Sequence, residues 1–342
     1  MGFEKAVCSK PALEEIVALF PFGPLVNYTD VSGVPNTTYL IYAESRQFLI
    51  RIYGKGQSSL AHILLEHELL VHLEQKGFRS PRLLRGRDGK MLFSWNGFYG
   101  CAFTFIPGMT ADTLPITPAI AESVGESVAS FGEAVADFPI GNVPLEETLL
   151  SRGELAMNQM GGALVDRGWL FDGPAVYAQW QAATRVLRSS CQAEQMGLLH
   201  ADTWPPNIMC NGDEVVGILD YDDCCFGPRI VDIAIPLQEF ALFQPDEKRH
   251  ELAMAFVAGL GRRGEHLDAP DWSVLMACME FMCSVWFAYN VIQSPRREDA
   301  ELYYKRLEML RNTGLTERLG ELCNNAFERA RRGGGRAKTF AG

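Results

Sequence analysis

The apolar residues of the first hundred positions alternate in the way that β-strands require. Two stretches, NTTYLIYA (36–43) and QFLIRIYG (47–54), are rich in β-branched and aromatic residues and are separated by the polar turn ESR. This pattern predicts a two-stranded hairpin. The apolar spacing then becomes helical over LAHILLEHELLVHLEQKG (60–77), and Gly77 predicts the end of that helix.

Helical spacing dominates after the IPG sequence at 106–108. It recurs in five segments, at 119–138, 174–191, 247–263, 274–292 and 301–313. We therefore expect an α+β fold of two lobes, a small β-rich N-terminal lobe and a larger α-helical C-terminal lobe. The predicted boundaries are 1–101 for the first lobe, 102–108 for a hinge, 109–330 for the second lobe and 331–342 for a disordered, Gly- and Arg-rich tail.

Composition and charge narrow the class of partner. The chain has 342 residues, of which 47% are hydrophobic and 21% charged, which is the balance of a globular protein with a sizeable core. Its formal net charge is −11 and its basic residues are scattered, whereas a nucleic-acid partner needs a basic face. We therefore expect no nucleic-acid partner, and an acidic surface suits a cationic small substrate.

The cysteines and one apolar segment bear on the cellular compartment. The nine cysteines include no CxxC pair, so their spacing predicts neither a disulfide framework nor a zinc site. We expect reduced, mostly buried thiols in a cytoplasmic protein. Residues 274–292 imitate a membrane span, but Glu280 near the middle would cost about 3 kcal/mol in a bilayer. A core helix, with no membrane partner, is therefore the expectation.

The stretch LLHADTWPPNIMCNGDEVVGILDYDD (198–223) gathers polar side chains between short apolar runs. Two consecutive prolines prevent a helix or central strand there, and the Asn-Gly pair predicts a hairpin between NIMC and VVGIL. Asp202 and Asn207 then share one loop, and Asp220 ends the returning strand. Phosphoryl transfer needs such a set, because one carboxylate must act on the attacking hydroxyl while an amide and a second carboxylate hold Mg²⁺. The alternative is an acidic hairpin whose carboxylates are merely solvated.

HADTWPPN has the form H-x-D-x-x-x-x-N of the kinase catalytic loop, and ILDYDD and VDIA follow it in order. These motifs resemble the aminoglycoside phosphotransferase and choline kinase-like superfamily, whose fold is protein-kinase-like, and they look closest to its homoserine kinase-like members. The resemblance implies that Asp202 is the catalytic base and that Asn207 and Asp220 bind the metal. It also implies structural roles for His200, which would brace the loop, and for Asp232.

The short interval after the predicted metal ligand bears on the kind of kinase. Only 12 residues separate Asp220 from Asp232, whereas protein kinases place a long activation segment after their metal-binding Asp. This spacing favours a small-molecule kinase. Asp222 and Asp223 are interpreted as solvated or loop-bonding residues outside the catalytic set.

The loop SGVPNTTYLI (32–41) resembles the G-x-x-N-T-x-Y form that homoserine kinase-like members place over the phosphates. Gly33 would permit close backbone approach, and Asn36 and Thr37 would offer hydrogen-bond donors. The same residues would also form an ordinary hairpin turn.

Strand alternation places Arg51 on the face opposite Phe48, Ile50 and Ile52. The family has a Lys at this position, which holds the α- and β-phosphates and pairs with a helix Glu, so the resemblance assigns that role to Arg51. By the same resemblance Glu66 is the predicted partner, because it stands where the family helix carries its Glu. Glu68 lies about 200° further around the helix, so the two cannot both face Arg51. A surface cation is the alternative.

The stretch CAFTFIPG (101–108) is predicted to run from a strand into the hinge. By resemblance, the adenine would meet the backbone of Thr104 and Ile106, with Phe103 behind the base and Met209 as its floor. Phe and Met would equally serve as core residues.

The identity of the phosphate acceptor is what the sequence determines least. Glu280 within an apolar helix must be paired, neutralised or used for binding, and Trp286 and Tyr289 on the same segment could form a cation box. An internal hydrogen bond for Glu280 and core packing for the two aromatic rings are the alternatives.

Taken together, these residues predict an ATP- and Mg²⁺-dependent phosphotransferase that acts on a hydroxyl of a small molecule, such as an amino alcohol, amino acid, sugar or aminoglycoside. A nucleotide-binding pseudokinase and a protein Ser/Thr kinase are the alternatives. We expect a monomer or homodimer.

Overall fold

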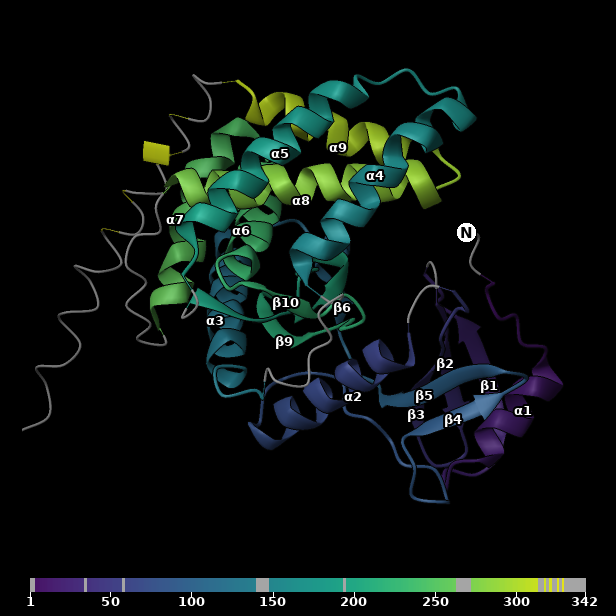
Figure 1. Ribbon diagram of the computed structural model, residues 1–342. Coiled ribbons are helices and arrows are strands. Elements are labelled where there is room, and N and C mark those ends of the chain that lie inside the picture. Colours follow the sequence, from purple (N-terminus) through teal and green to yellow (C-terminus); the bar gives the residue numbers. More distant parts are fainter. Residues whose placement is uncertain are drawn as a thin grey trace, which may run out of the picture. The chain divides into compact units, whose positions relative to one another are not determined.

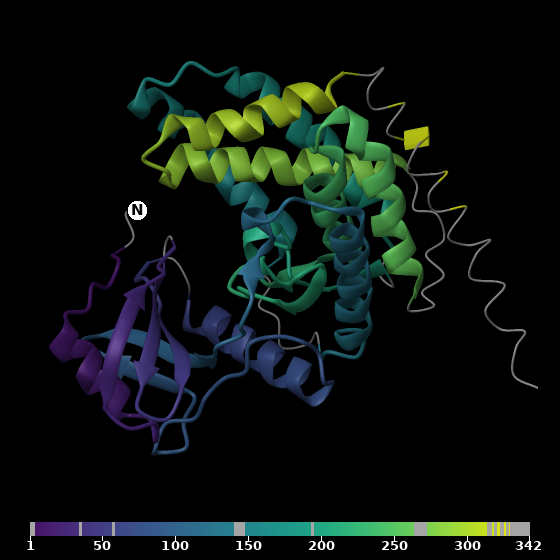
Figure 2. The ribbon, with the colours of Figure 1, turned by 180° about the vertical axis from the view of Figure 1, so that it is seen from behind.

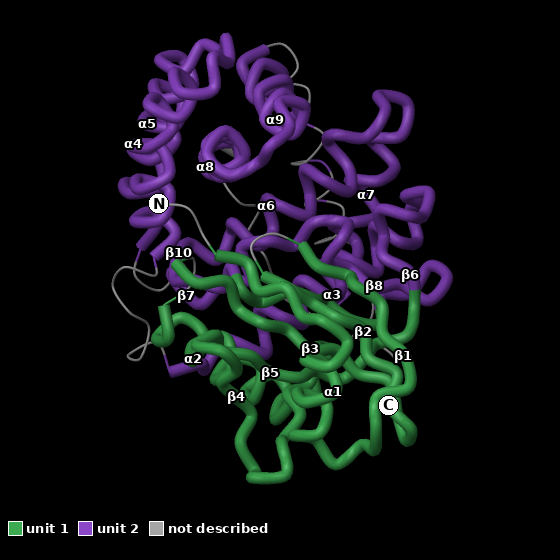
Figure 3. Tube along the Cα trace, turned by 90° about the vertical axis from the view of Figure 1, so that its right-hand side faces the viewer, with its two compact units in different colours: residues 1–108, 216–222 green, residues 109–215, 223–342 purple. Residues whose placement is uncertain are grey.

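The computed structural model describes residues 4–33, 36–56, 59–139, 148–192, 195–262 and 272–312, with single positions at 317, 320, 321, 325 and 328. The predicted tail at 331–342 lies outside these residues. The chain forms two compact units, one of Met1–Gly108 with Val216–Asp222 and one of Met109–Val215 with Asp223–Gly342 (Figure 3). Residues 216–222, which the sequence-based division assigns to the second lobe, therefore cluster with the first.

The first unit is built on a five-stranded antiparallel sheet with the strand order β1-β2-β3-β5-β4 (Figure 1). Its strands are β1 (Leu25–Asp30), β2 (Thr37–Ala43), β3 (Gln47–Ile52), β4 (Leu92–Trp95) and β5 (Phe98–Thr104). The predicted hairpin is confirmed as β2 and β3, whose register sets Thr38 opposite Arg51.

The two faces of β3 differ as its alternation predicts. Phe48, Ile50 and Ile52 are fully buried and join a hydrophobic core with helix α1 (Lys10–Ala18), which begins with Ser9 as its N-cap. Arg51 projects from the other face, where it meets helix α2 (Leu60–Gln75). One face of the sheet is thus core, and the other carries Arg51.

Helix α2 forms over the predicted segment. The hydroxyl of Ser59 accepts the backbone N–H of His62 at 3.1 Å and caps the first turn. Gly77 follows the helix at φ 70°, a left-handed conformation that stops a helix and that glycine adopts without strain. The predicted helix end is confirmed.

The second unit is mainly helical. Its helices are α3 (Pro118–Ala134), α4 (Leu149–Arg167), α5 (Gly173–Ser190), α6 (Val231–Leu237), α7 (Asp246–Arg262), α8 (Trp272–Gln293) and α9 (Arg297–Leu310). Short strands are β6 (Met109–Thr110), β7 (Met196–Leu199), β8 (Ile208–Asn211), β9 (Glu214–Ile218) and β10 (Cys225–Pro228). β7 pairs with β10, and β6, β8 and β9 form a small sheet whose β9 continues into the first unit.

All five segments with helical spacing are helices, namely α3, α5, α7, α8 and α9. Helix α4 was not predicted, and its three glycines, at 153, 161 and 162, explain why the helical signal is weak. α3 and α7 approach most closely at Gly125 and Gly259, because a Cβ at either position would overlap the backbone of the facing helix.

Helix α8, the segment that imitates a membrane span, packs against α4, α5 and α9 (Figure 2). Its window Val274–Gln293 is long and apolar enough to cross a membrane, but 67% of that window is buried inside the structure. A core helix of a folded protein meets the same criteria. The eight cysteines that the structure describes are free, and seven of them are buried.

The helix that follows β10 changes its winding part-way. Pro236 lies inside α6 and has no N–H to continue the α-helical hydrogen bonds, and the next residues, Gln238–Leu242, form one π-helical segment, η6. Such segments occur often at functional sites. Here it carries Glu239, a buried carboxylate.

Candidate active site

The loop after β7 brings Asp202 and Asn207 into direct contact. The side-chain Nδ2 of Asn207 donates to Oδ2 of Asp202 at 2.7 Å and to its backbone oxygen at 3.0 Å. The residues between them form a 3₁₀ turn, η5 (Pro205–Asn207), which begins at the two prolines. Since Nδ2 donates to Asp202, Oδ1 is the amide atom of Asn207 that a metal ion would bind.

His200 and Asp232 fix the start of this loop through hydrogen bonds to its backbone. The carboxylate of Asp232, in the first turn of α6, accepts the backbone N–H of His200 at 2.8 Å and that of Ala201 at 2.9 Å. His200 is fully buried, and its Nδ1 accepts the N–H of Asp202 at 3.2 Å. Ala201 adopts φ 64°, an unfavourable conformation for a residue with a Cβ, which these bonds maintain. Burial raises the pKa of Asp232 to about 6, against the effect of the two N–H donors.

In the first unit, Arg51 joins two carboxylates. Its Nη1 lies 3.1 Å from Oε1 of Glu66 and its Nη2 lies 2.7 Å from Oδ1 of Asp220. Burial by itself would lower the pKa of Arg51, but Asp220 and Glu66 outweigh it and hold the pKa above its usual range. The guanidinium also lies 5.3 Å from the ring centre of Phe103, so this ring contacts the cation.

Glu66, at 1% exposure, is fixed by a second donor that sequence analysis did not find. The hydroxyl of Tyr53 donates to Oε2 of Glu66 at 2.8 Å, and it also lies 3.3 Å from Nε2 of His67. Tyr53 is two residues after Arg51, so both side chains lie on the same side of the extended chain. This spacing is the sequence signal from which the contact could have been predicted. Glu68, the rejected alternative partner, is exposed.

Asp222, interpreted from the sequence as a bystander, binds a residue of the predicted phosphate loop. Nδ2 of Asn36 donates to Oδ2 of Asp222 at 2.7 Å, while Oδ1 of Asn36 accepts the N–H of Gly54 at 3.1 Å. Nε2 of His62 is hydrogen-bonded to the backbone oxygen of Asp222. The loop after β1, helix α2 and the segment after β9 are therefore tied together within the first unit.

The other predicted residues of the phosphate loop have contacts of their own. The hydroxyl of Thr37 donates to the backbone oxygen of Ala6 at 2.5 Å. The backbone oxygen of Gly33 accepts from Nζ of Lys5 at 2.9 Å, and a Cβ at Gly33 would meet nothing within 4 Å. Asn36 and Thr37 were predicted to donate hydrogen bonds to phosphate. Both side chains already have hydrogen-bond partners within the protein.

The predicted adenine contacts come from the end of β5, the segment after it and β8. The N–H of Thr104, at the end of β5, donates to the backbone oxygen of Arg82 at 2.9 Å. Ile106 packs against Gly217, where a Cβ would lie 2.8 Å from its Cδ1. Met209 lies on β8 opposite Thr110 of β6, in the second unit.

Comparison with known proteins identifies the family. The model of the phosphotransferase enzyme family matches residues 29–277, most of the chain. The chain belongs to this family. It is therefore an enzyme, a phosphotransferase of the small-molecule kinase type.

The relatives of this phosphotransferase agree with that membership. The homoserine kinase of Rhodopseudomonas palustris (strain BisA53) is 27% identical over 283 residues, which cover 77% of this chain and 78% of that enzyme. An amicoumacin kinase solved with AMP-PNP and Ca²⁺ has a TM-score of 0.70 at 16% identity, covering 88% of this chain and 93% of that one. A microcompartment-associated aminopropanol kinase has a TM-score of 0.68 at 18% identity, covering 96% and 99%. The predicted bilobal kinase-like fold is confirmed.

In this phosphotransferase, the three residues predicted for the acceptor lie among the helices of the second unit. Oε1 of Glu280 accepts from Nε2 of Gln179 at 3.1 Å, and burial raises the pKa of this carboxyl. Trp286 packs against the ring of Tyr303 at 5.4 Å, and Tyr289 is half-buried. Glu280 thus has an internal hydrogen-bond partner, one of the alternatives that the sequence left open.

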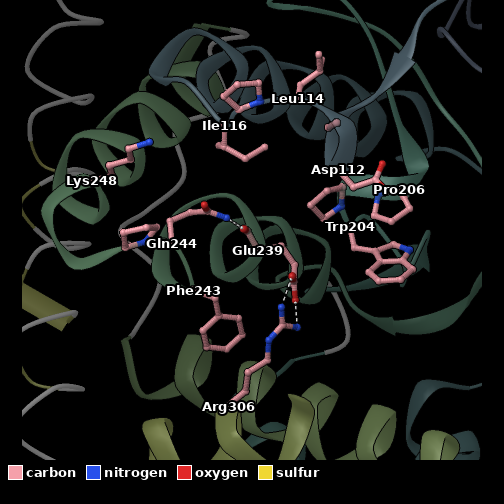
Figure 4. A pocket seen from close by; sticks show the side chains of 14 residues that line it. Asp112, Leu114, Ile116, Trp204, Pro206, Glu239, Phe243, Gln244, Lys248 and Arg306 are labelled. Carbon is pink, nitrogen blue, oxygen red and sulfur yellow. Dashed lines mark hydrogen bonds and ion pairs between the residues drawn. The ribbon is translucent and has the colours of Figure 1, made fainter. Parts of the chain in front are cut away.

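The second unit of the phosphotransferase also contains a pocket of about 620 Å³ beside the catalytic loop (Figure 4). Fourteen residues line it, drawn from within 111–116, 204–206 and 239–248 together with Arg306. At its base, Arg306 binds Glu239 through two parallel hydrogen bonds of 2.6 and 2.8 Å. Burial raises the pKa of Glu239, while Arg306 opposes that rise. Sequence analysis missed this pocket, because its walls come from four separate segments.

Proposed function

We propose that this enzyme transfers the γ-phosphoryl group of ATP, with Mg²⁺, to a hydroxyl of a small amine-bearing molecule. The observation that carries the proposal is the contact of Asp202 with Asn207 on the H-x-D-x-x-x-x-N loop. The names of two relatives support the acceptor class, since homoserine and aminopropanol, which name those kinases, are both amine-bearing alcohols.

Asp202 acts on the acceptor. Its carboxylate orients the attacking hydroxyl and takes its proton as the new oxygen–phosphorus bond forms and the bond between the γ-phosphorus and the β,γ-bridging oxygen breaks, which releases ADP. The hydrogen bond from Asn207 at 2.7 Å and the N–H bond to His200 fix Asp202 in one orientation.

Asn207 and Asp220 provide the oxygen donors suited to Mg²⁺. The amide oxygen of Asn207 and the carboxylate of Asp220, at 39% side-chain exposure, are hard ligands, and Mg²⁺ takes one or two such protein groups together with phosphate oxygens and water. The described ranges contain no group of three or more His, Cys, Asp and Glu side chains suited to a metal, which fits an ion held largely by the nucleotide. When bound, Mg²⁺ neutralises charge on the β- and γ-phosphate oxygens.

Arg51 aligns the phosphates. Its charge is held by Glu66 on one side, and Tyr53 holds Glu66, so the guanidinium has a fixed direction. Asp232 and His200 are structural in this proposal, Phe103, Thr104, Ile106 and Met209 surround the adenine, and Gly33, Asn36 and Thr37 belong to the loop over the phosphates.

The test compares Asp202→Asn with Asp223→Asn, a matched change at a side chain that is 59% exposed. ADP release is measured with a panel of amino alcohols, hydroxy amino acids and aminoglycosides, and ATP binding is measured by thermal shift. We expect Asp202→Asn to lower kcat by about 10²–10⁴-fold with ATP binding intact, and Asp223→Asn to change it little.

Near-full turnover by Asp202→Asn would refute the proposal. A nucleotide-dependent thermal shift of the wild type with no turnover of any acceptor would favour the pseudokinase instead. Labelling of proteins in a cell lysate with radioactive ATP, without labelling of small molecules, would favour a protein kinase.

A further inference from the structure

The pocket lies beside the loop that carries Asp202, the residue proposed to act on the acceptor hydroxyl. Trp204, Pro205 and Pro206 form one of its walls and directly follow Asp202 and Thr203 in the chain. Asp202 is also close enough to help raise the pKa of Tyr303, after the larger effects of burial and Glu239. The ring of Tyr303 in turn lies 5.1 Å from the guanidinium of Arg306 at the base of the pocket.

The charges around this pocket cancel, although the chain as a whole carries −11. Four charged residues line it, Asp112 and Glu239 with negative charge and Lys248 and Arg306 with positive charge. Glu239 and Arg306 neutralise each other through their paired hydrogen bonds. The pocket therefore offers no net attraction to a ligand of a single sign.

The remaining two charges lie on different sides of the pocket. Figure 4 shows Asp112 and Trp204 on one side of the pocket and Lys248 on the other, with Glu239 and Arg306 between them. Asp112 and Lys248 are both exposed, and neither forms an ion pair with another residue within the described ranges. Opposite charges at two sides of one cavity match a ligand that carries both.

The side with Asp112 suits an ammonium group. The carboxylate of Asp112 and the half-buried ring of Trp204 are on this side, and together they can offer an amine charge attraction and a cation–π contact. This side adjoins the catalytic loop, so an amine bound there lies near the hydroxyl that is to be phosphorylated.

The side with Lys248 suits a carboxylate. Arg306 uses one N–H of each terminal nitrogen for Glu239, and its guanidinium lies 4.5 Å from the ring centre of Phe243. A guanidinium has five N–H donors, so further donors can bind an anion that Lys248 attracts. The rings of Phe243 and Tyr303 keep Arg306 oriented before any ligand arrives.

We infer that this pocket is the acceptor site and that it selects a zwitterion, a hydroxylated amino acid whose ammonium binds Asp112 and Trp204 and whose carboxylate binds Lys248 and Arg306. The inference rests on the proposed function and narrows its acceptor class. It excludes simple amino alcohols and polycationic aminoglycosides as preferred acceptors, because both would leave Lys248 facing a cation or an apolar group.

Three matched acceptors test the inference on the full-length enzyme. Homoserine carries both charges, 3-aminopropan-1-ol lacks its carboxylate, and 4-hydroxybutyrate lacks its amine. Other hydroxy amino acids are assayed beside them. We expect the wild type to phosphorylate at least one hydroxy amino acid with kcat/KM about 10-fold or more above that of its counterpart lacking either charge.

Two variants assign the charges. Lys248→Gln is expected to raise KM for the hydroxy amino acid about 10-fold and to leave KM for the amino alcohol within about 2-fold. Asp112→Asn is expected to raise KM for both amines and to spare the hydroxy acid. Lys305→Gln and Asp166→Asn, at exposed positions outside the pocket, are the controls.

Two results would overturn the inference while the proposed function stands: wild-type preference for an acceptor with one charge only, or equal effects of Lys248→Gln on both amines. Absence of phosphorylation of every acceptor would instead contradict the proposed function itself. Thermal unfolding of each variant identifies any general loss of folding, which exposed positions of this kind rarely cause.

Discussion

Nη2 of Arg51 lies 2.7 Å from Oδ1 of Asp220, so the strand cation is paired with the proposed metal ligand as well as with Glu66. The family resemblance leads us to expect a Lys at this place. A guanidinium has nitrogens that point in different directions and can bind two carboxylates at once, whereas an ammonium is a single point charge. The paired contacts are therefore a physical reason for Arg at this position.

Replacing Arg51 separates its charge from its shape. Arg51→Met should lower the free energy of unfolding by about 3 kcal/mol or more, because Glu66 would remain buried without a counter-charge. Arg51→Lys should restore most of that stability but raise KM for ATP, since it keeps the charge and loses the fork. Urea unfolding and steady-state kinetics measure the two effects.

The control for Arg51 is Arg82→Met, which removes a cation at 58% exposure from a 3.8 Å pair with Glu74. Its loss should cost at most about 1 kcal/mol. Equal stability losses for the two variants would mean that the buried pair has no special role.

The bond between Asn36 and Asp222 predicts energetic coupling between two segments 186 residues apart in sequence. Asn36→Ala and Asp222→Ala should each raise KM for ATP, because each releases the phosphate loop from the segment after β9. We express each change in KM as a free energy. The change in the double variant should be smaller than the sum of the two single changes by about 1–2 kcal/mol, as expected for a charged hydrogen bond. The matched cycle of Asn36→Ala with Asp223→Ala should show additivity; coupling there of the same size would contradict the assignment.

His67 predicts a pH dependence for the first unit. Burial, with a smaller effect of Arg51, lowers the pKa of His67 from 6.5 to about 4. Below pH 6.5 His67 is protonated in the unfolded chain, whereas in the folded chain it stays neutral until about pH 4. The free energy of unfolding should therefore decrease as pH falls from 6.5 to 4, by up to about 3 kcal/mol.

His67→Gln should remove this slope, which urea unfolding at several pH values between 4.5 and 7.5 measures. Asp232 acts with the opposite sign, because its raised pKa contributes stability below pH 3.8 that is lost as pH rises through about 6. The difference between wild type and variant is therefore the quantity to compare. His250→Gln, at an exposed position, is the control, and a slope that persists in His67→Gln would refute the role of His67.

Individual strands, helices and turns could be predicted from the sequence because each depends on residues that are close together in the chain. Alternation on β3 placed Phe48 and Ile50 in the core and Arg51 on the opposite face. Helical periodicity showed that Glu66 and Glu68 cannot both face Arg51, and the resemblance to the family helix selected Glu66. The turn at Gly212 has φ 60°, as the Asn-Gly hairpin signal requires. Helix α4 escaped prediction because its glycines weaken the local preference that its packing against α8 supplies.

Such patterns could not predict contacts between segments that are far apart in sequence. Asp222 was interpreted as a solvated or loop-bonding residue, but its actual partner, Asn36, lies in a segment that no periodicity relates to it. The pocket beside the catalytic loop likewise depends on Glu239 in a π-helical turn and on Arg306 of a distant helix.

The amino-acid order alone thus identified the residues of the proposed chemistry: the H-x-D-x-x-x-x-N loop, the second Asp after a hairpin and the strand cation, each recognised within a few adjacent residues. Which side chains share partners, and which charges surround the acceptor pocket, required the folded chain. Hydrogen bonds and ion pairs depend on positions within a few ångströms, and those positions arise from packing between segments that are far apart in sequence.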